Sequence, residues 1–233
     1  MHELQLQQVR LACNVLTLHW RYAMRFNVIV ADPPWAFSDK LQMGTTARSA
    51  DDNYSTLTLS DIAALPVSDI AEPTGCLLAL WTPSCMLIDG LMVMQRWGFE
   101  FKGTYVWTKM RRDMQQPAIG MGHLFRQSHE LAIVGVMGKP LRTIQDHGQR
   151  SACLAINKGH SIKPEALQDS LDLMWPAAAK LELFARRQRP GWTCVGDELD
   201  ELDIRHVLPA LAAATQLCQP AQDAVCLDNE VVQ

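Results

Sequence analysis

Short apolar runs rich in β-branched residues alternate along this chain with segments of helical periodicity. Residues 26–31 (FNVIVA), 75–81 (GCLLALW) and 131–137 (LAIVGVM) are predicted to be buried strands. Further strands are expected at 99–109, 181–185 and 192–195, and helices at 58–64, 83–97, 164–175 and 200–214. This alternation predicts an α/β fold of three layers with a mostly parallel sheet. In such sheets a ligand lies beyond the carboxyl ends of the strands.

The length of 233 residues fits one domain with terminal extensions. We predict an N-terminal extension over 1–25, a catalytic domain over 26–214 and a disordered C-terminal tail over 215–233. No apolar stretch is long enough to span a membrane and no signal peptide is evident, so we expect a cytoplasmic protein without a membrane partner. The seven cysteines show neither a C-x-x-C pair nor zinc-ligand spacing, which favours reduced thiols and no metal site.

The charge is unevenly distributed along the chain. The formal net charge is −4, which by itself argues weakly against a polyanionic partner. Residues 102–163, however, carry 10 basic and 3 acidic side chains, whereas the segments on either side are acidic. The basic middle segment is a candidate surface for phosphates, and solvated charges scattered by the fold are the alternative.

The tetrapeptide Asp32-Pro33-Pro34-Trp35 directly follows the first predicted strand. The two prolines fix φ and remove two backbone donors, so the turn presents carbonyl oxygens. A carboxylate, acceptor carbonyls and an indole at one strand end suit a flat ring that carries an amino group. A Pro-Pro turn beside a core tryptophan is the structural alternative.

Several further segments follow in a characteristic order, and with them the chain resembles the DPPW-motif family of N6-adenine methyltransferases from about Phe26 to Leu199. Members of that family modify adenine in mRNA or in bacterial and phage DNA. The matching segments are VIVADPPW, YSTL followed by LPV, LALWTP, VWTK, Gly122-His123, His129-Glu130, Lys163-Pro164-Glu165, LELFAR, and Gly191-Trp192 before Gly196-Asp197-Glu198.

The resemblance implies a Rossmann-like methyltransferase fold that uses S-adenosylmethionine and no metal. The DPPW motif precedes the LELFAR segment, which is the order of the β-type amino-methyltransferases. A G-x-G-x-x-G fingerprint is absent from the sequence, which argues against an ordinary dinucleotide site. Nucleic acid is the implied partner, with DNA favoured over RNA, and a homodimer is compatible with the family.

The resemblance also implies roles for the catalytic motif. Asp32 is expected to accept a hydrogen bond from the adenine N6 amine and to lie against the cofactor, and the Pro33 carbonyl is expected to accept the second bond. Pro34 stiffens the turn, and Trp35 is expected to stack on the extruded base. The work of the site would be positioning and the stabilisation of charge that develops on nitrogen.

Substrate contacts are expected from two polar loops, 36–53 and 110–128, on either side of the motif. Tyr54 matches an aromatic position near the family's active site. Glu130 is expected to orient a neighbouring side chain rather than to react. The other predicted substrate-binding residues are Lys109, Arg111, Arg112, His123 and Arg126.

Cofactor contacts are implied for four further residues. Lys163 is expected to bind the methionine carboxylate, and Arg186 to hold or shield the ribose. Asp197 and Glu198 are expected to accept hydrogen bonds from the ribose hydroxyls. The family commonly has asparagine where this chain has Asp197, so its contact need not be the same, although it remains an acceptor.

Three alternatives to DNA adenine methylation remain open on the sequence. They are the same chemistry on RNA, a non-catalytic subunit that binds nucleic acid, and methylation of a small-molecule amine. The intact DPPW motif argues against the second, and the basic middle segment argues against the third.

Overall fold

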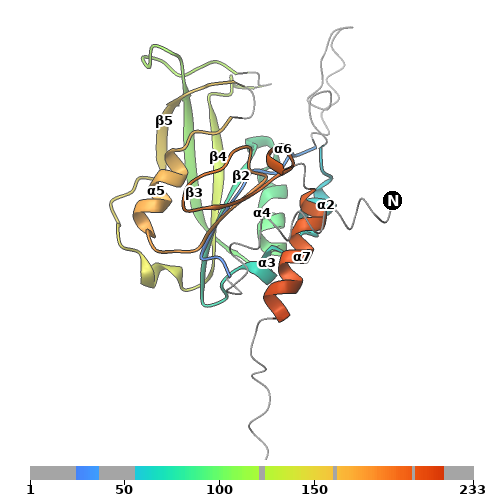
Figure 1. Cartoon of the computed structure of the whole chain (residues 1–233). Helices are drawn as coiled ribbons and strands as arrows, with labels where there is room; N and C mark the ends of the chain where they lie inside the picture. The colour runs from blue at the N-terminus through green and yellow to red at the C-terminus, as the bar shows by residue number, and fades with distance from the viewer. Residues whose placement is uncertain (1–24, 37–55, 121–123, 160–161, 201–202, 218–233) are drawn as a thin grey trace, which may run out of the picture.

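The computed structural model describes residues 25–36, 56–120, 124–159, 162–200 and 203–217 (Figure 1). The strands are β1 (Val28–Ala31), β2 (Gly75–Thr82), β3 (Glu100–Met110), β4 (His129–Gly138), β5 (Ala152–Ile156), β6 (Lys180–Leu183) and β7 (Thr193–Val195). The helices are α2 (Leu59–Ala63), α3 (Val67–Ile70), α4 (Leu87–Arg96), α5 (Ala166–Met174), α6 (Asp197–Asp200) and α7 (Ile204–Leu217). Short 3-10 turns, η2 (Ser84–Met86) and η3 (Pro140–Thr143), follow β2 and β4.

The strands of the described residues form one sheet in the order β5-β3-β4-β2-β1-β6-β7. β1 pairs in parallel with both β2 and β6, β6 with β7, and β3 with β5. Only β4 runs against its neighbours, β2 and β3. The carboxyl ends of the other six strands therefore meet at one edge of the sheet. We call it the catalytic edge, because the residues predicted to be catalytic follow β1 there.

The sheet has a separate apolar core on each of its two faces, so the fold consists of three layers: helices, sheet and helix. In β1, Ile29 and Ala31 face a core formed with α2, α3, α4 and α7, whereas Val28 and Val30 face a core formed with α5. Figure 1 shows α3, α4 and α7 on one side of the sheet and α5 on the other. Because successive side chains of a strand point to opposite faces, a central strand covered on both sides must be apolar throughout.

The predicted three-layer α/β architecture with a mostly parallel sheet is confirmed. The six predicted strands are present within one or two residues of their expected ends. The last helix runs from Ile204 to Leu217 rather than over 200–214. The sequence prediction missed β5 (ACLAI), a five-residue edge strand whose side chains are exposed or half-buried, because so short an apolar run does not by itself distinguish a strand from a helix.

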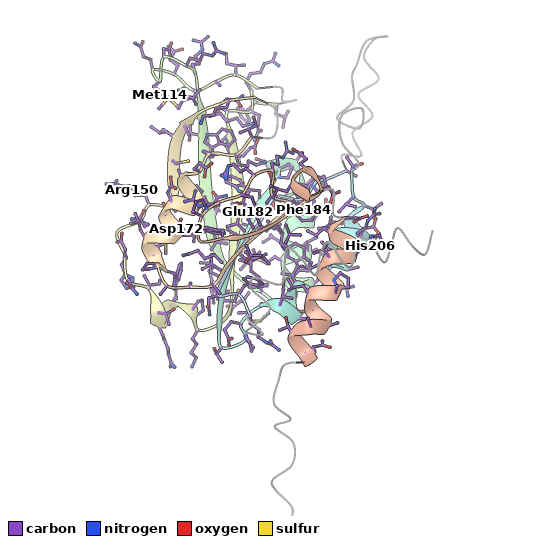
Figure 2. The ribbon with its side chains drawn as sticks, viewed as in Figure 1. Met114, Arg150, Asp172, Glu182, Phe184 and His206 are labelled. Atoms are coloured by element: carbon purple, nitrogen blue, oxygen red, sulfur yellow. The ribbon has the colours of Figure 1, made fainter. Side chains whose placement is uncertain are left out.

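The turn after β6 has a constrained backbone. Phe184 has φ 61°, a left-handed conformation that a bulky side chain rarely adopts. Figure 2 labels this residue near the middle of the molecule. The turn passes so close to β7 that a Cβ on Gly196 would lie 2.2 Å from the Ala185 carbonyl oxygen. Glycine at 196 is therefore required for the approach of the two strand ends at the catalytic edge.

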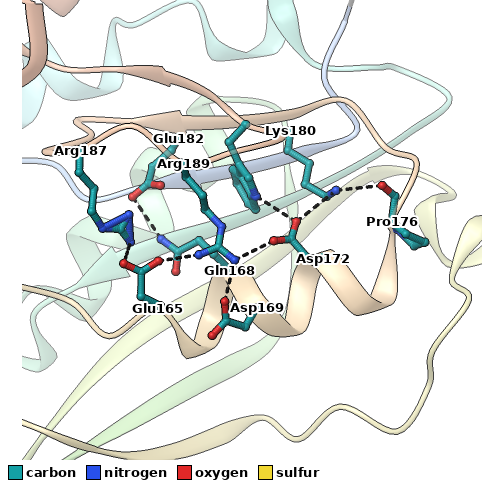
Figure 3. Close-up of polar contacts among 10 residues, drawn as sticks. Glu165, Gln168, Asp169, Asp172, Pro176, Lys180, Glu182, Arg187 and Arg189 are labelled. Atoms are coloured by element: carbon teal, nitrogen blue, oxygen red, sulfur yellow. Dashed lines mark hydrogen bonds and ion pairs between the residues drawn. The ribbon is translucent and has the colours of Figure 1, made fainter.

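A cluster of ion pairs ties α5 to the segment between β6 and β7 (Figure 3). Arg189 donates to Glu165 at 2.5 Å, to Asp169 at 2.6 Å and to Asp172 at 2.7 Å. Lys180, whose side chain is 5% exposed, pairs with Asp172 at 3.2 Å. Burial alone would raise the pKa of Asp172, but hydrogen bonds from Arg189 and Lys180 outweigh it and lower that pKa.

Replacing Arg189 should test how much this cluster stabilises the fold. Its side chain is 13% exposed and pairs with three carboxylates, so Arg189→Met should lower the free energy of unfolding by about 2 kcal/mol. Arg187→Met is the matched control, because Arg187 is 39% exposed and forms one pair, with Glu165. Denaturant titration of both variants measures the difference. Equal losses of unfolding free energy in the two variants would show that the three ion pairs of Arg189 stabilise the fold no more than the single surface pair of Arg187.

Candidate active site

Asp32 is the first polar residue after the buried strand β1. Its backbone amide donates to the Leu183 carbonyl at 3.4 Å, which extends the pairing with β6 by one residue. Its side chain is 22% exposed, in contrast to the fully buried strand before it. The carboxylate of Asp32 thus stands at the catalytic edge, between the ends of β2 and β6.

The Pro-Pro turn is held through its carbonyl oxygens, as expected for a turn with two missing donors. The Trp35 amide donates to the Pro33 carbonyl at 2.9 Å, and the Leu57 amide donates to the Pro34 carbonyl at 3.0 Å. A carbonyl oxygen has two lone pairs, so Pro33 retains the capacity for a second hydrogen bond.

Trp35 is the aromatic residue of the motif and is predicted to stack on a base. Its side chain is 5% exposed and belongs to the core on the α4 face, and its Nε1 donates to the Trp81 carbonyl at 2.9 Å. The ring therefore packs in the core of this structure, and its stacking on a base stays a prediction. The indole fastens the Pro-Pro turn to the end of β2, which fixes the position of Asp32.

Four charged side chains form a continuous chain of ion pairs at the catalytic edge. Lys163 Nζ lies 2.8 Å from both carboxylate oxygens of Asp32 and 3.3 Å from Glu130. Glu130 in turn lies 2.5 Å from Lys109 Nζ. Lys163 Nζ also lies 5.7 Å from the centre of the Trp81 ring, within the range of a cation–π interaction. These side chains are between 16% and 26% exposed, so solvent screens them only partly.

The pairing changes the protonation of its members. Burial would lower the pKa of Lys163, but Asp32 and Glu130 outweigh burial and raise that pKa. Burial would raise the pKa of Glu130, but Lys163 and Lys109 outweigh burial and lower it. Both shifts favour the charged forms of Lys163 and Glu130, and the Lys163 ammonium orients the Asp32 carboxylate, whose oxygens can accept hydrogen bonds.

The basic segment 102–163 divides between the two ends of the sheet. Strand direction places four of its basic residues near the opposite edge: Lys102, Lys139, Arg142 and Arg150. The other six follow the strands that end at the catalytic edge or lie in the loops there: Lys109, Arg111, Arg112, Arg126, Lys158 and Lys163. Arg111, Arg112 and Arg126 are exposed on the connection between β3 and β4.

Some of the predicted substrate-binding positions lie outside the described residues. They are Tyr54, His123 and nearly all of the predicted loop 36–53.

The four residues predicted to contact a cofactor also lie at the catalytic edge. Arg186 Nε lies 3.4 Å from Glu198, across the gap between the ends of β6 and β7. Asp197 is exposed at the start of α6, and burial of its carboxyl together with the nearby Asp203 raises its pKa. Lys163 faces Asp32, so the ammonium predicted for a methionine carboxylate is bound here to protein carboxylates.

No group of three or more His, Cys, Asp or Glu side chains within the described residues could hold a metal ion. In the same part of the chain, no helix combines the length and the apolar character needed to cross a membrane.

Comparison with known proteins identifies the family. The MT-A70 family model matches residues 26–198, which include the Asp32 turn, Lys163 and the Asp197-Glu198 pair. The chain belongs to the MT-A70 family. The type II methyltransferase M.MunI of Mycoplasma sp. is 31% identical over 193 residues, 76% of this chain and 79% of that protein. Family membership confirms the predicted resemblance and assigns adenine N6-methyltransferase chemistry.

Two further MT-A70 relatives are much longer than this chain. The catalytic subunit METTL3 of the human N(6)-adenosine-methyltransferase is 26% identical over 83% of this chain, which spans 32% of that protein. A probable N(6)-adenosine-methyltransferase of rice is 28% identical over 81% of this chain, which spans 25% of that protein. The similarity to these relatives is thus confined to a quarter to a third of their length.

Sequence reasoning missed the pairing of Lys163 with Asp32, which lies 131 positions earlier. It also did not assign Lys109 a partner. One signal was available: Lys109 ends a predicted strand and Glu130 begins the next, so a hairpin would bring the two charges together. No comparable local signal points to Lys163, because only the completed sheet brings it to the end of β1.

The ion pairs at the catalytic edge predict how the stability of the fold depends on pH. The pKa of Glu130 is lower in the fold than its ordinary value of 4.5, so its contribution to stability is present above that pH and is lost as the pH falls through the lowered pKa. Lys163→Met removes the largest single cause of that lowering, the attraction of the Lys163 charge, and should raise the pKa of Glu130. The acid-side loss of stability should then be smaller and should end at a higher pH. Unfolding free energies measured across the acid range check this, and unchanged curves would contradict it.

Proposed function

We propose that this protein transfers a methyl group to the exocyclic N6 of adenine in DNA. The observation that carries the proposal is the Asp32 carboxylate, fixed at the end of β1 by the Pro-Pro turn and by Lys163. Family membership supplies the reaction class. The similarity to a type II methyltransferase, most of whose length is matched, favours DNA over RNA.

The geometry of Asp32 suits an adenine amine. An aromatic amine normally delocalises its lone pair into the ring. A carboxylate that accepts one N–H bond, with the Pro33 carbonyl accepting the other, would hold both protons out of the ring plane and leave the lone pair on nitrogen. Lys163 orients the Asp32 carboxylate, whose negative charge stabilises the positive charge that develops on the amine nitrogen, so the site works by positioning and by electrostatics. Removal of the proton before attack is not required.

We propose S-adenosylmethionine as the methyl donor, because it supplies a methyl group on a positively charged sulfur. The described residues fit such a group. Asp197 and Glu198 are carboxylates, which accept two hydrogen bonds from neighbouring ribose hydroxyls. Gly196 lets the ends of β6 and β7 approach closely beside them. Lys163 would bind the methionine carboxylate only by sharing its three protons with Asp32 and Glu130.

The central test is Asp32→Ala. Methyl transfer to random-sequence duplex DNA should fall by about a hundredfold or more, because the acceptor of the amine proton is lost. Binding of S-adenosylmethionine, measured by calorimetry, should largely survive and serves as the control for folding. Persistent turnover would contradict the role of Asp32. Failure of the unaltered protein to bind the donor would favour a non-catalytic subunit that binds nucleic acid.

Matched DNA and RNA oligonucleotide pools, methylated in parallel, distinguish the two substrate classes. We expect transfer to DNA to exceed transfer to RNA. The reverse preference would reassign the substrate and leave the chemistry at Asp32 unchanged.

Salt dependence tests the basic residues beside the site. The logarithm of DNA affinity should fall linearly with the logarithm of salt concentration, and Arg111→Gln together with Arg112→Gln should reduce that slope by about two. Arg142→Gln is the matched control, because Arg142 is exposed on η3 at the opposite edge. A slope that all these variants leave unchanged would show that the arginines at 111 and 112 do not face phosphates.

A further inference from the structure

The connection between β3 and β4 exposes large apolar side chains to water. Leu124 is 93% exposed, Phe125 86% and Ile119 74%. Figure 2 labels Met114, a fourth member at 44% exposure, at the end of this arm farthest from α7. Single exposed apolar residues are ordinary, but several in one loop mark a contact surface. Leu124 and Phe125 are adjacent and are the most exposed of them.

The base of this loop is fastened to the catalytic edge. The Gly120 amide donates to the Gln127 carbonyl at 2.9 Å, and a Cβ at Gly120 would lie 2.4 Å from that oxygen. The Gln127 side chain donates to Ser84 Oγ at 2.8 Å and to the His129 carbonyl at 3.1 Å. Leu124 and Phe125 therefore project from an anchored turn.

The anchors lie close to the residues that hold Asp32. Ser84 follows the end of β2, the strand beside β1. His129 precedes Glu130, which pairs with Lys163, the partner of Asp32. Leu124 and Phe125 therefore lie on a loop that is attached to the catalytic edge, where the adenine amine would be held.

Charge near the pair favours a nucleic acid over a protein as its occupant. Arg111, Arg112 and Arg126 are exposed on the same connection, and Asp113 is its one acidic residue between 111 and 128. Exposed apolar side chains that share a connection with exposed guanidinium groups complement a duplex, whose stacked bases lie inside two rows of phosphates. A second copy of this acidic chain is the competing occupant.

We propose that Leu124 and Phe125 enter duplex DNA beside the target adenine and fill the space that the extruded base leaves. The inference rests on the proposed function and adds that the substrate is double-stranded. Apolar side chains inserted between base steps offset the loss of stacking when a base leaves the helix. A single strand has no duplex stacking to replace. The proposal therefore predicts that loss of the two side chains slows methyl transfer to duplex DNA more than to single-stranded DNA.

The experiment compares duplex and single-stranded substrates. Methyl transfer by the double variant Leu124→Ala, Phe125→Ala is measured on random-sequence duplex DNA and on the same pool after heat denaturation. The duplex rate should fall about tenfold or more while the single-strand rate changes by about twofold or less. Leu141→Ala is the matched control, since Leu141 is 63% exposed on η3 at the opposite edge. It should leave both rates unchanged.

Three other results overturn the inference. Equal losses on both substrates, or no loss, would show that the pair does not replace the extruded base. A dimer in sedimentation that the double variant converts to a monomer would assign the pair to a contact between subunits. If the unaltered protein methylates neither pool, the proposed function fails and the inference fails with it, which the first measurement reveals before any variant is made.

Discussion

The burial of β1 on both faces is the constraint on which the rest of the structure depends. Its four residues are apolar because one core lies on each side of the sheet, and both neighbouring strands run parallel to it. No reactive group can therefore lie within the strand. The first position where a polar side chain can stand is the residue after it, which is Asp32, and the Pro-Pro turn and the buried Trp35 keep that residue in place.

Charge at this strand end is balanced across distant parts of the chain. Lys163 precedes α5, Glu130 is the second residue of β4 and Lys109 is the last but one of β3, yet they form one line of ion pairs that ends at Asp32. Breaking a partly buried pair leaves one charge without compensation, so each member depends on the others. The line also connects the acceptor carboxylate to the hairpin that carries the exposed arginines.

The features that were predicted correctly from the sequence are those that depend on local residue patterns. The apolar runs located six strands, and the residues after them included Asp32 and Lys109. Sequence reasoning missed β5, an edge strand of five apolar residues, because so short a run does not distinguish a strand from a helix. It also did not show that the Trp35 ring packs in the core, because a motif does not indicate which way a ring faces. It also left Lys163 without its partner, since a contact between residues 131 positions apart exists only after the sheet has formed.

The reversed direction of β4 has a consequence for how relatives with this fold can diverge. Parallel neighbours need a crossover that packs on the sheet, so a change in its length disturbs a helix and a core. The connection between the antiparallel strands β3 and β4 needs no such crossover. Insertions, deletions and substitutions there can change the surface beside Asp32 at little cost in folding stability. β1 and the β3–β4 connection can then evolve at separate rates.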